Sequence, residues 1–190
     1  RLRLEKGKYI LLSAHREENI ETEKNFLSLF NAINRMADKY DMPILYSCHP
    51  RSRNRLTASG FQLDPRVIQH EPLGFHDYNC LQMNAFAVVS DSGTLPEESS
   101  FFTSVGHPFP AICIRTSTER PEAIDKGDFI IAGIDEHSLL QAVDTAIELC
   151  HDGQHGIPVP DYVDENVSTK VVKILQSYVG IVNKMVWRKS

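Results

Sequence analysis

The stretch that decides the fold runs from Phe86 to Ser99 and reads FAVVSDSGTLPEES. Its apolar start, residues 86–89, is typical of the end of a buried parallel strand. Small and polar residues follow, and a helix can begin there with Ser92 or Thr94 as N-cap and glutamates in its first turn. Proline at position 96 is compatible with this start, because the first turn of a helix leaves its N–H groups without partners.

A strand, a glycine turn and a helix N-terminus together present free N–H groups and the positive end of a helix dipole. This arrangement suits a phosphate or diphosphate. A carboxylate one turn into the helix can then accept hydrogen bonds from the two hydroxyls of a ribose. The alternative is an ordinary capped helix, and the stretch alone leaves both interpretations open.

The composition is that of a single globular domain. The chain has 190 residues, of which 42% are hydrophobic and 24% charged, and its net charge of -5 argues against a nucleic-acid partner. It contains no apolar run long enough to span a membrane and no signal-peptide pattern. The cysteines, at positions 48, 80, 113 and 150, form no CxxC motif, so we expect reduced thiols in a cytoplasmic protein.

Apolar runs and helical periodicities alternate along the chain, which predicts an α/β fold with a parallel sheet covered on both faces. The predicted strands are residues 9–14, 44–48, 67–69, 86–89, 111–114 and 129–132. The predicted helices are residues 22–40, 51–59, 75–84, 94–104, 135–150, 166–179 and 180–187.

Unusual polar clusters follow directly after several predicted strands. They are residues 15–17, His49, residues 92–93 and residues 115–122. Ligands of parallel sheets bind at the carboxyl ends of the strands, so we expect these clusters to share one edge. The segment 151–155, with a histidine at each end, invites a metal interpretation, but two nearby glycines and the lack of a further ligand favour a solvated loop.

Taken together, the clusters resemble the C-terminal half of the non-hydrolysing UDP-N-acetylglucosamine 2-epimerase family. The motifs that carry the resemblance are AHREEN (14–19), HP (49–50), EPL (71–73), SDSG with EE (90–98) and TERPE (118–122). The family has two Rossmann-like domains facing a cleft, as in GT-B glycosyltransferases. The resemblance implies that this chain is the second domain of a homodimeric enzyme.

The first residue is Arg1 rather than Met, and we expect a piece of a longer protein. On this interpretation residues 1–179 form the UDP-binding domain. Residues 180–190 are a C-terminal helix that crosses to the missing N-terminal domain. Their apolar face, which ends in Trp187, would otherwise be exposed or pack on a second copy.

Some positions depart from the usual family pattern. Thr94 and Pro96 stand where the family has a glycine and a glutamine, and the loop 103–110 is longer than usual. These features resemble the branch that forms UDP-N-acetyl-L-fucosamine from UDP-2-acetamido-2,6-dideoxy-L-talose, for capsule and O-antigen synthesis. Interconversion of UDP-GlcNAc and UDP-ManNAc is the alternative.

The resemblance assigns the UDP-binding residues. Ser92 and Gly93 correspond to the diphosphate-binding turn, and Glu98 to the glutamate that holds the ribose hydroxyls. Tyr78 aligns with an aromatic residue beside the uracil, and Leu73 lines the same pocket through its backbone. A core position is the alternative for the tyrosine.

His15 resembles the essential histidine of the family, which faces the diphosphate and stabilises charge on the departing UDP or donates a proton. Arg120 can offer its guanidinium to the diphosphate or sugar, the alternative being a salt bridge with Glu119 or Glu122. Arg16 and His49 resemble residues that contact a second, allosteric UDP-sugar in some members.

The hydrogen on C2 of an acetamido sugar is not adjacent to a carbonyl. The family solves this by anti elimination of UDP across C1–C2 and re-addition with the proton on the other face, without cofactor or metal. The carboxylates that move the proton lie in the first domain, so we expect this chain to bind UDP weakly without turnover. The rival interpretations are a GT-B UDP-sugar glycosyltransferase and a non-catalytic module that binds UDP-sugars.

Overall fold

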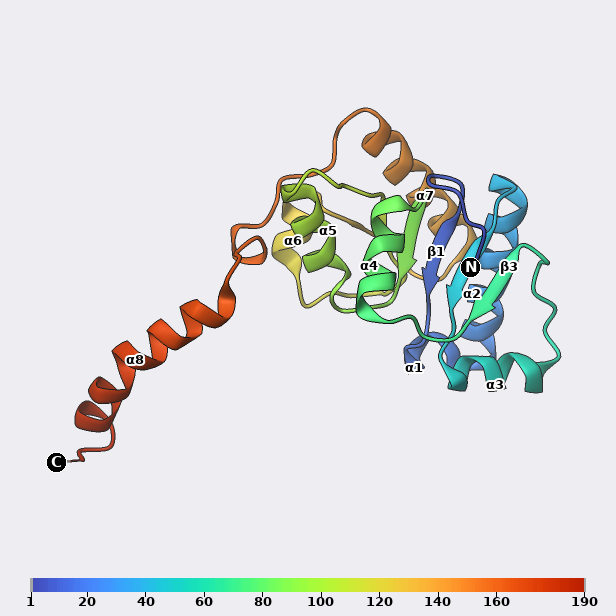
Figure 1. Ribbon diagram of the computed structural model, residues 1–190. Helices are drawn as coiled ribbons and strands as arrows, with labels where there is room; N and C mark the ends of the chain where they lie inside the picture. Colours follow the sequence, from blue (N-terminus) through green and yellow to red (C-terminus); the bar gives the residue numbers. More distant parts are fainter. Residues whose placement is uncertain (1, 190) are drawn as a thin grey trace.

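The computed structural model describes residues 2–189, which form one parallel sheet of strand order β3-β2-β1-β4-β5-β6 (Figure 1). The strands are β1 (Ile10–Ser13), β2 (Ile44–Ser47), β3 (Val67–His70), β4 (Ala87–Ser90), β5 (Ala111–Cys113) and β6 (Ile130–Ile131). The order reverses between β1 and β4, as in Rossmann-like folds. The predicted parallel α/β fold is therefore confirmed.

Helices cover both faces of the sheet, as predicted. They are α1 (Glu17–Ile20), α2 (Glu23–Tyr40), α3 (Pro50–Ser59), α4 (Phe75–Asn84), α5 (Leu95–Ser104), α6 (Pro121–Asp125), α7 (Glu136–His151) and α8 (Val167–Met185), with a 3-10 turn η1 (Pro160–Tyr162). On one face Leu12 of β1 packs with Phe30 of α2 and Leu139 of α7. On the other face the neighbouring Leu11 packs with Leu95 of α5.

Local side-chain chemistry sets the ends of several helices. Thr22 accepts a hydrogen bond from the Asn25 amide at the start of α2 (3.1 Å), and Asp135 accepts one from the Ser138 amide at the start of α7 (3.0 Å). Gly60 closes α3 in a left-handed conformation, with φ of 66°. These boundaries were predicted from the sequence and are confirmed.

Three helices differ from the prediction. Helices α1 and α6 are too short to produce an apolar periodicity, so no pattern indicated them. The two helices predicted over residues 166–187 are one helix, α8, with Gly180 in its interior. A glycine inside a helix costs only about 1 kcal/mol relative to alanine, so it need not end one.

Helix α8 extends away from the rest of the chain (Figure 1) and buries none of its residues. Its exposed apolar side chains are Val167, Val171, Val172, Ile174, Leu175, Tyr178, Val179, Ile181, Val182 and Met185. A contiguous apolar face of this kind marks an interaction surface. Among the helices of residues 2–189, none combines the length and apolar character needed to cross a bilayer.

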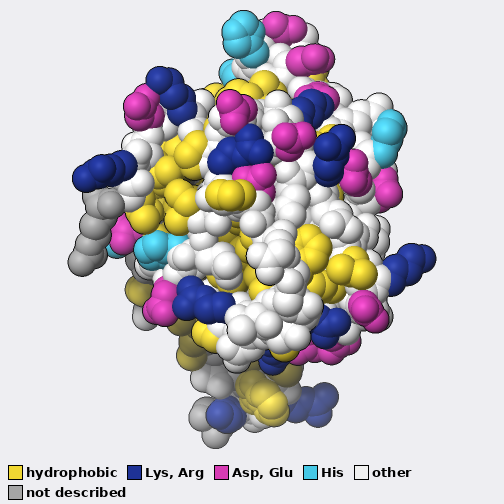
Figure 2. Space-filling view, turned by 90° about the vertical axis from the view of Figure 1, so that its right-hand side faces the viewer, with side chains coloured by type: hydrophobic (Ala, Val, Ile, Leu, Met, Phe, Trp, Pro, Cys, Tyr) yellow, Lys and Arg dark blue, Asp and Glu magenta, His cyan; other side chains and the backbone are white. Residues whose placement is uncertain are grey.

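The face of the molecule shown in Figure 2 carries acidic and basic side chains in alternation, interrupted by apolar side chains. Cationic groups on this face are scattered among carboxylates. Such a mixed surface does not provide the continuous basic stripe that binds a phosphate backbone.

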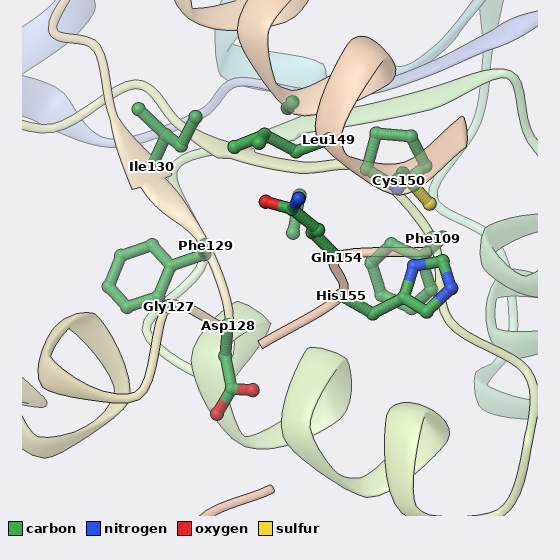
Figure 3. A pocket seen from close by; sticks show the side chains of 12 residues that line it. Phe109, Gly127, Asp128, Phe129, Ile130, Leu149, Cys150, Gln154 and His155 are labelled. Atoms are coloured by element: carbon green, nitrogen blue, oxygen red, sulfur yellow. The ribbon is translucent and has the colours of Figure 1, made fainter. Parts of the chain in front are cut away.

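A cavity of about 40 Å³ lies between the amino ends of β5 and β6 and the end of α7 (Figure 3). Gln154 and His155 run beside the segment Gly127–Asp128 there, and the Ile157 amide donates to the Lys126 carbonyl (2.9 Å). The strand ends at this cavity are opposite to those that carry the polar clusters. The cavity therefore belongs to the packing of the C-terminal segment and not to the candidate site.

Gly156 and Gly153 allow a matched test of the close approach between the C-terminal segment and residues 127–128. Both glycines have positive φ (82° and 78°). A Cβ at Gly156 would lie 2.6 Å from the Gly127 carbonyl oxygen, whereas a Cβ at Gly153 meets nothing within 4 Å. We expect Gly153→Ala to lower the free energy of unfolding by about 1–2 kcal/mol, the cost of the left-handed conformation. Gly156→Ala should cost clearly more in urea denaturation. Equal losses of unfolding free energy in the two variants would show that Gly156 does not pack tightly against Gly127.

Candidate functional site

The polar clusters lie at the carboxyl edge of the sheet, where β1 and β4 are neighbours and the strand order reverses. Ser13 and Ser90 are paired at the ends of these strands, and the Asp91 amide donates to the Ser13 carbonyl (3.0 Å). The loops that follow, residues 14–16 and 91–94, are therefore held side by side. This is the edge that the sequence predicted.

A single buried carboxylate joins the two loops. Asp91 has no exposed surface, and its Oδ2 accepts from the His15 amide (2.8 Å), the Arg16 amide (2.8 Å) and the Asn19 side-chain amide (3.1 Å). The Asn19 amide also donates to the Ile114 carbonyl (3.1 Å), which extends the connection to the end of β5. Asp91 thus organises the ends of three strands.

His15 lies at this junction with its ring open to solvent on one side. Its side chain is 43% exposed, and its Nδ1 lies 3.3 Å from Ser13 Oγ and 3.6 Å from Asp91 Oδ1. The ring of His49, which follows β2, has its centroid 6.4 Å from that of His15. The structure therefore brings together the two histidines singled out from the sequence.

Arg16 lies above the turn that the sequence assigned to a diphosphate. Its Nε donates to the Asp91 carbonyl (2.9 Å), and its Nη2 would lie 3.4 Å from a Cβ placed on Gly93. A guanidinium directly over a glycine turn adds positive charge to the N-terminus of α5. The side chain predicted to contact an allosteric ligand is thus adjacent to the proposed UDP site.

The start of α5 departs from ordinary capping. Thr94 occupies the N-cap position, but its hydroxyl caps no backbone N–H and donates instead to Glu98 Oε1 (2.8 Å). The Ser92 amide is held by Ser90 Oγ (3.0 Å). The first turn of a helix has N–H groups without intrahelical partners, so they remain available to an anion.

Glu98 is held from two sides. Its Oε2 accepts from the side-chain amide of Gln82 on α4 (2.6 Å), while Oε1 accepts from Thr94. Gln82 is completely buried, so it anchors the carboxylate to the protein interior. The Thr94 hydroxyl is exposed and can exchange with a ligand hydroxyl, while the Gln82 contact keeps the carboxylate in place.

Tyr78 and Leu73 both pack against the core cluster that lies under α4 and α5. Burial raises the pKa of Tyr78 to about 12, so the phenol is neutral near pH 7. Its hydroxyl is buried, and no hydrogen-bond partner for it lies within the described residues. The contact of Tyr78 with a uracil stays a prediction.

Arg120 forms a salt bridge, but not with the partners considered from the sequence. Its Nε donates to Glu97 Oε1 (2.7 Å) on α5. Glu119 and Glu122 were the carboxylates named in the alternative interpretation, and the side chains of both have other partners, Arg115 and Tyr162. The alternative named the wrong carboxylates because α5 and α6 pack together, which brings Glu97 to Arg120. The contact of Arg120 with a diphosphate or sugar stays a prediction.

Sequence reasoning missed Arg115 as an individual residue. Its side chain is almost completely buried and donates through both terminal nitrogens to the Glu119 carboxylate (2.8 Å each). These hydrogen bonds lower the pKa of Glu119 to about 2. Arg115 Nε also lies 3.6 Å from the Glu18 carboxylate, so the arginine joins the loop before Arg120 to α1.

Asp91 and Gln82 were missed as well. The first stands directly after a buried strand in the SDSG motif, a position at which an acidic residue can bind neighbouring loop amides. The second lies at an interior position of α4, where no sequence signal distinguishes it. Within residues 2–189 no cluster of three His, Cys, Asp or Glu side chains is arranged to hold a metal ion.

The family model described as UDP-N-acetylglucosamine 2-epimerase matches residues 1–176 of the sequence. The chain belongs to this family. UDP-N-acetylglucosamine 2-epimerase from Methanococcus maripaludis is 32% identical over 146 residues, which are 74% of this chain and 38% of that protein. The family to which the motifs pointed is therefore confirmed.

Solved structures of family members have the same fold. That of UDP-N-acetylglucosamine 2-epimerase from Rickettsia bellii aligns with 99% of this chain at 36% identity and a TM-score of 0.83, and this chain covers 49% of it. A Methanocaldococcus jannaschii UDP-GlcNAc 2-epimerase in complex with UDP-GlcNAc and UDP aligns with 89% at 26% identity and a TM-score of 0.76, and 45% of it is covered. The chain thus spans about half the length of its solved relatives.

Asn19 allows the buried network to be tested without touching the catalytic candidates. Asn19→Ala removes a donor from Asp91 and from the Ile114 carbonyl, and unpaired buried groups of this kind cost about 1–3 kcal/mol. Asn25→Ala is the control, because its amide donates to the Glu18 carbonyl at the surface (2.8 Å) and should cost about 0.5 kcal/mol or less. Urea denaturation measures both. Similar losses would mean that the Asp91 network contributes little to stability.

Proposed function

We propose that this chain is the UDP-binding half of a nucleotide-sugar 2-epimerase that acts on a UDP-2-acetamido sugar. The observation that carries the proposal is the Asp91 junction, which places Arg16 over Gly93 at the N-terminus of α5. Free N–H groups and a guanidinium there suit a diphosphate. The solved Methanocaldococcus relative with UDP-GlcNAc and UDP supports a ligand of this class.

In the proposed complex the residues hold UDP along the sheet edge. The diphosphate meets the N-terminus of α5 at Ser92 and Gly93, and the ribose hydroxyls replace Thr94 at the Glu98 carboxylate. The uracil lies near Leu73 and Tyr78. Arg120, oriented by Glu97, contributes its remaining guanidinium N–H groups to the diphosphate or sugar.

The proposed chemistry is elimination of UDP and its re-addition. Cleavage of the C1–O bond leaves the electron pair on the diphosphate, while C2 loses its proton, and re-addition returns the proton to the opposite face. His15 and the α5 N-terminus stabilise the charge on the departing diphosphate, which is electrostatic catalysis. Groups preorganised in this way keep UDP bound between the two steps.

We propose that the proton-moving groups lie in the half of the relatives that this chain does not cover. On this proposal residues 1–179 bind UDP, and residues 180–190 cross to that other half. The alignment with the Rickettsia structure extends over 99% of this chain, which includes most or all of α8. The isolated chain then binds UDP without turning it over, and the complete protein works as a cytoplasmic homodimer.

For the sugar we propose the L-fucosamine branch, hence UDP-2-acetamido-2,6-dideoxy-L-talose in capsule or O-antigen precursor synthesis. The support is Thr94, which stands at a family glycine position and whose hydroxyl holds Glu98, together with the buried Pro96. Interconversion of UDP-GlcNAc and UDP-ManNAc is the second candidate, favoured by the name of the family and of its relatives.

Glu98 provides the test of UDP binding. Glu98→Gln should weaken UDP binding by about 10–100-fold, since a hydrogen bond to a charged group contributes about 1.5–3 kcal/mol. The preference for UDP over 2′-deoxy-UDP should also shrink, because the lost contact is to the ribose. Titration calorimetry measures both nucleotides. Glu97→Gln is the control and should change both affinities by the same factor. Undiminished ribose discrimination in Glu98→Gln would contradict the assignment.

The exposed face of α8 provides the test of the domain proposal. Without its other half, the chain should self-associate through this face, as light scattering against concentration would show. Ile181→Asn with Met185→Asn should reduce the association, because both apolar side chains are more than half exposed. Lys173→Gln with Lys184→Gln is the matched control on the same helix. A wild-type chain that stays monomeric at all concentrations would contradict the expectation.

A further inference from the structure

We infer that Asp91 is a positioning residue that sets the ring orientation and the tautomer of His15. The inference about catalysis rests on the proposed function, in which the ring faces the diphosphate. The inference about the tautomer concerns the free protein and stands on the geometry of the two side chains.

The burial of Asp91 is the first step of the argument. The side chain has no exposed surface, and a carboxylate in that position is unfavourable unless donors surround it. Three N–H groups donate hydrogen bonds to Oδ2 of Asp91. Oδ1 is also buried, and among the described residues it has no hydrogen-bond partner. One oxygen is therefore saturated, and the other is still able to accept.

The position of the His15 ring is the second step. Its Nδ1 lies 3.6 Å from Asp91 Oδ1 and 3.3 Å from Ser13 Oγ. A carboxylate accepts only, whereas a hydroxyl can donate or accept. With a buried acceptor on this side, the favoured neutral ring carries its proton on Nδ1. Nε2 is then the unprotonated nitrogen.

The same carboxylate also holds the backbone of His15. Oδ2 accepts from the His15 amide, so ring and backbone are both oriented by one side chain. The other ionisable groups at this face are Arg16, which donates to the Asp91 carbonyl, and His49, whose ring is 6.4 Å away. Neither of these contacts is to Nδ1. Asp91 is the anion that determines how the ring is presented.

A catalytic consequence follows. When the ring takes up a proton on Nε2, the resulting imidazolium faces Asp91 Oδ1 with Nδ1–H, at an N···O distance of 3.6 Å, and donates Nε2–H to the diphosphate oxygen that gains the C1–O electron pair. A carboxylate bound to one ring nitrogen holds the imidazole in one tautomer and orientation and stabilises the imidazolium, so its removal should lower activity. Asp91 acts through His15 and touches no substrate.

The test is ¹⁵N NMR of the histidine rings in the free chain at a pH where His15 is neutral. We expect wild-type His15 to be the Nδ1–H tautomer. In Asp91→Asn the amide can present its NH₂ to Nδ1, so the tautomer should change to Nε2–H. Ser13→Ala is the matched control and should keep Nδ1–H, because the carboxylate remains. His49 should be unchanged in both variants.

Three results would overturn the inference: an Nε2–H wild-type ring, an unchanged tautomer in Asp91→Asn, or a reversed tautomer in Ser13→Ala. If Asp91→Asn does not fold, the wild-type and Ser13→Ala spectra still decide whether His15 carries its proton on Nδ1 without help from Ser13. UDP titration of Asp91→Asn should show a loss of affinity, whereas Ser13→Ala should bind UDP as the wild type does. Because the tautomer is read without nucleotide, absence of UDP binding to the wild type would overturn the proposed function and leave the tautomer result standing.

Discussion

The buried carboxylate of Asp91 is the interaction on which the candidate site depends. Where the strand order reverses, the chain segments that leave the two neighbouring strands pass to opposite faces of the sheet, and ligands of such folds bind between them. The loops that leave the two strands need a polar connection, because their backbone N–H groups are withdrawn from water. Asp91 supplies it by accepting from two consecutive amides of the opposite loop and from Asn19. The candidate site is thus built around a carboxylate that is completely buried.

The cations of the site divide into two kinds. Arg115 and Arg120 are each bound to a carboxylate, Glu119 and Glu97, and therefore hold loops in place. Arg16 is different, because its Nε donates to the Asp91 carbonyl, and its charge acts on the Glu119 carboxylate only from beyond salt-bridge distance. A guanidinium above a helix N-terminus that is not bound directly to a carboxylate retains its capacity to bind an anion. The electrostatic centre of the proposed diphosphate site is therefore Arg16 with Gly93, and Arg120 is secondary.

The fold could be predicted from the sequence where the apolar periodicity and the end residues of a single helix or strand define it. Helix α4 was expected over residues 75–84 and has these bounds, and α2 and α7 begin directly after the first residue of their predicted ranges. The site could be placed on the correct edge because that edge follows from topology. Its internal contacts could not be predicted. The partner of Arg120 is 23 residues distant, and Gln82 contacts Glu98 across two helices. Such contacts depend on how helices pack, which local patterns do not encode.

Two surfaces of the structure, the apolar face of α8 and the candidate site, are left uncovered. The apolar face of α8 has no partner within the described chain, and the candidate site is a single wall, with the His15 side chain 43% exposed. An elimination that releases UDP between two steps requires a site that excludes water and retains the leaving group. An open sheet edge satisfies neither requirement. A second wall that closed over this edge and also received α8 would satisfy both, and the relatives have about half of their length left to form it. The exposed face of the helix and the proposed chemistry would therefore both be served by the one additional domain that we propose.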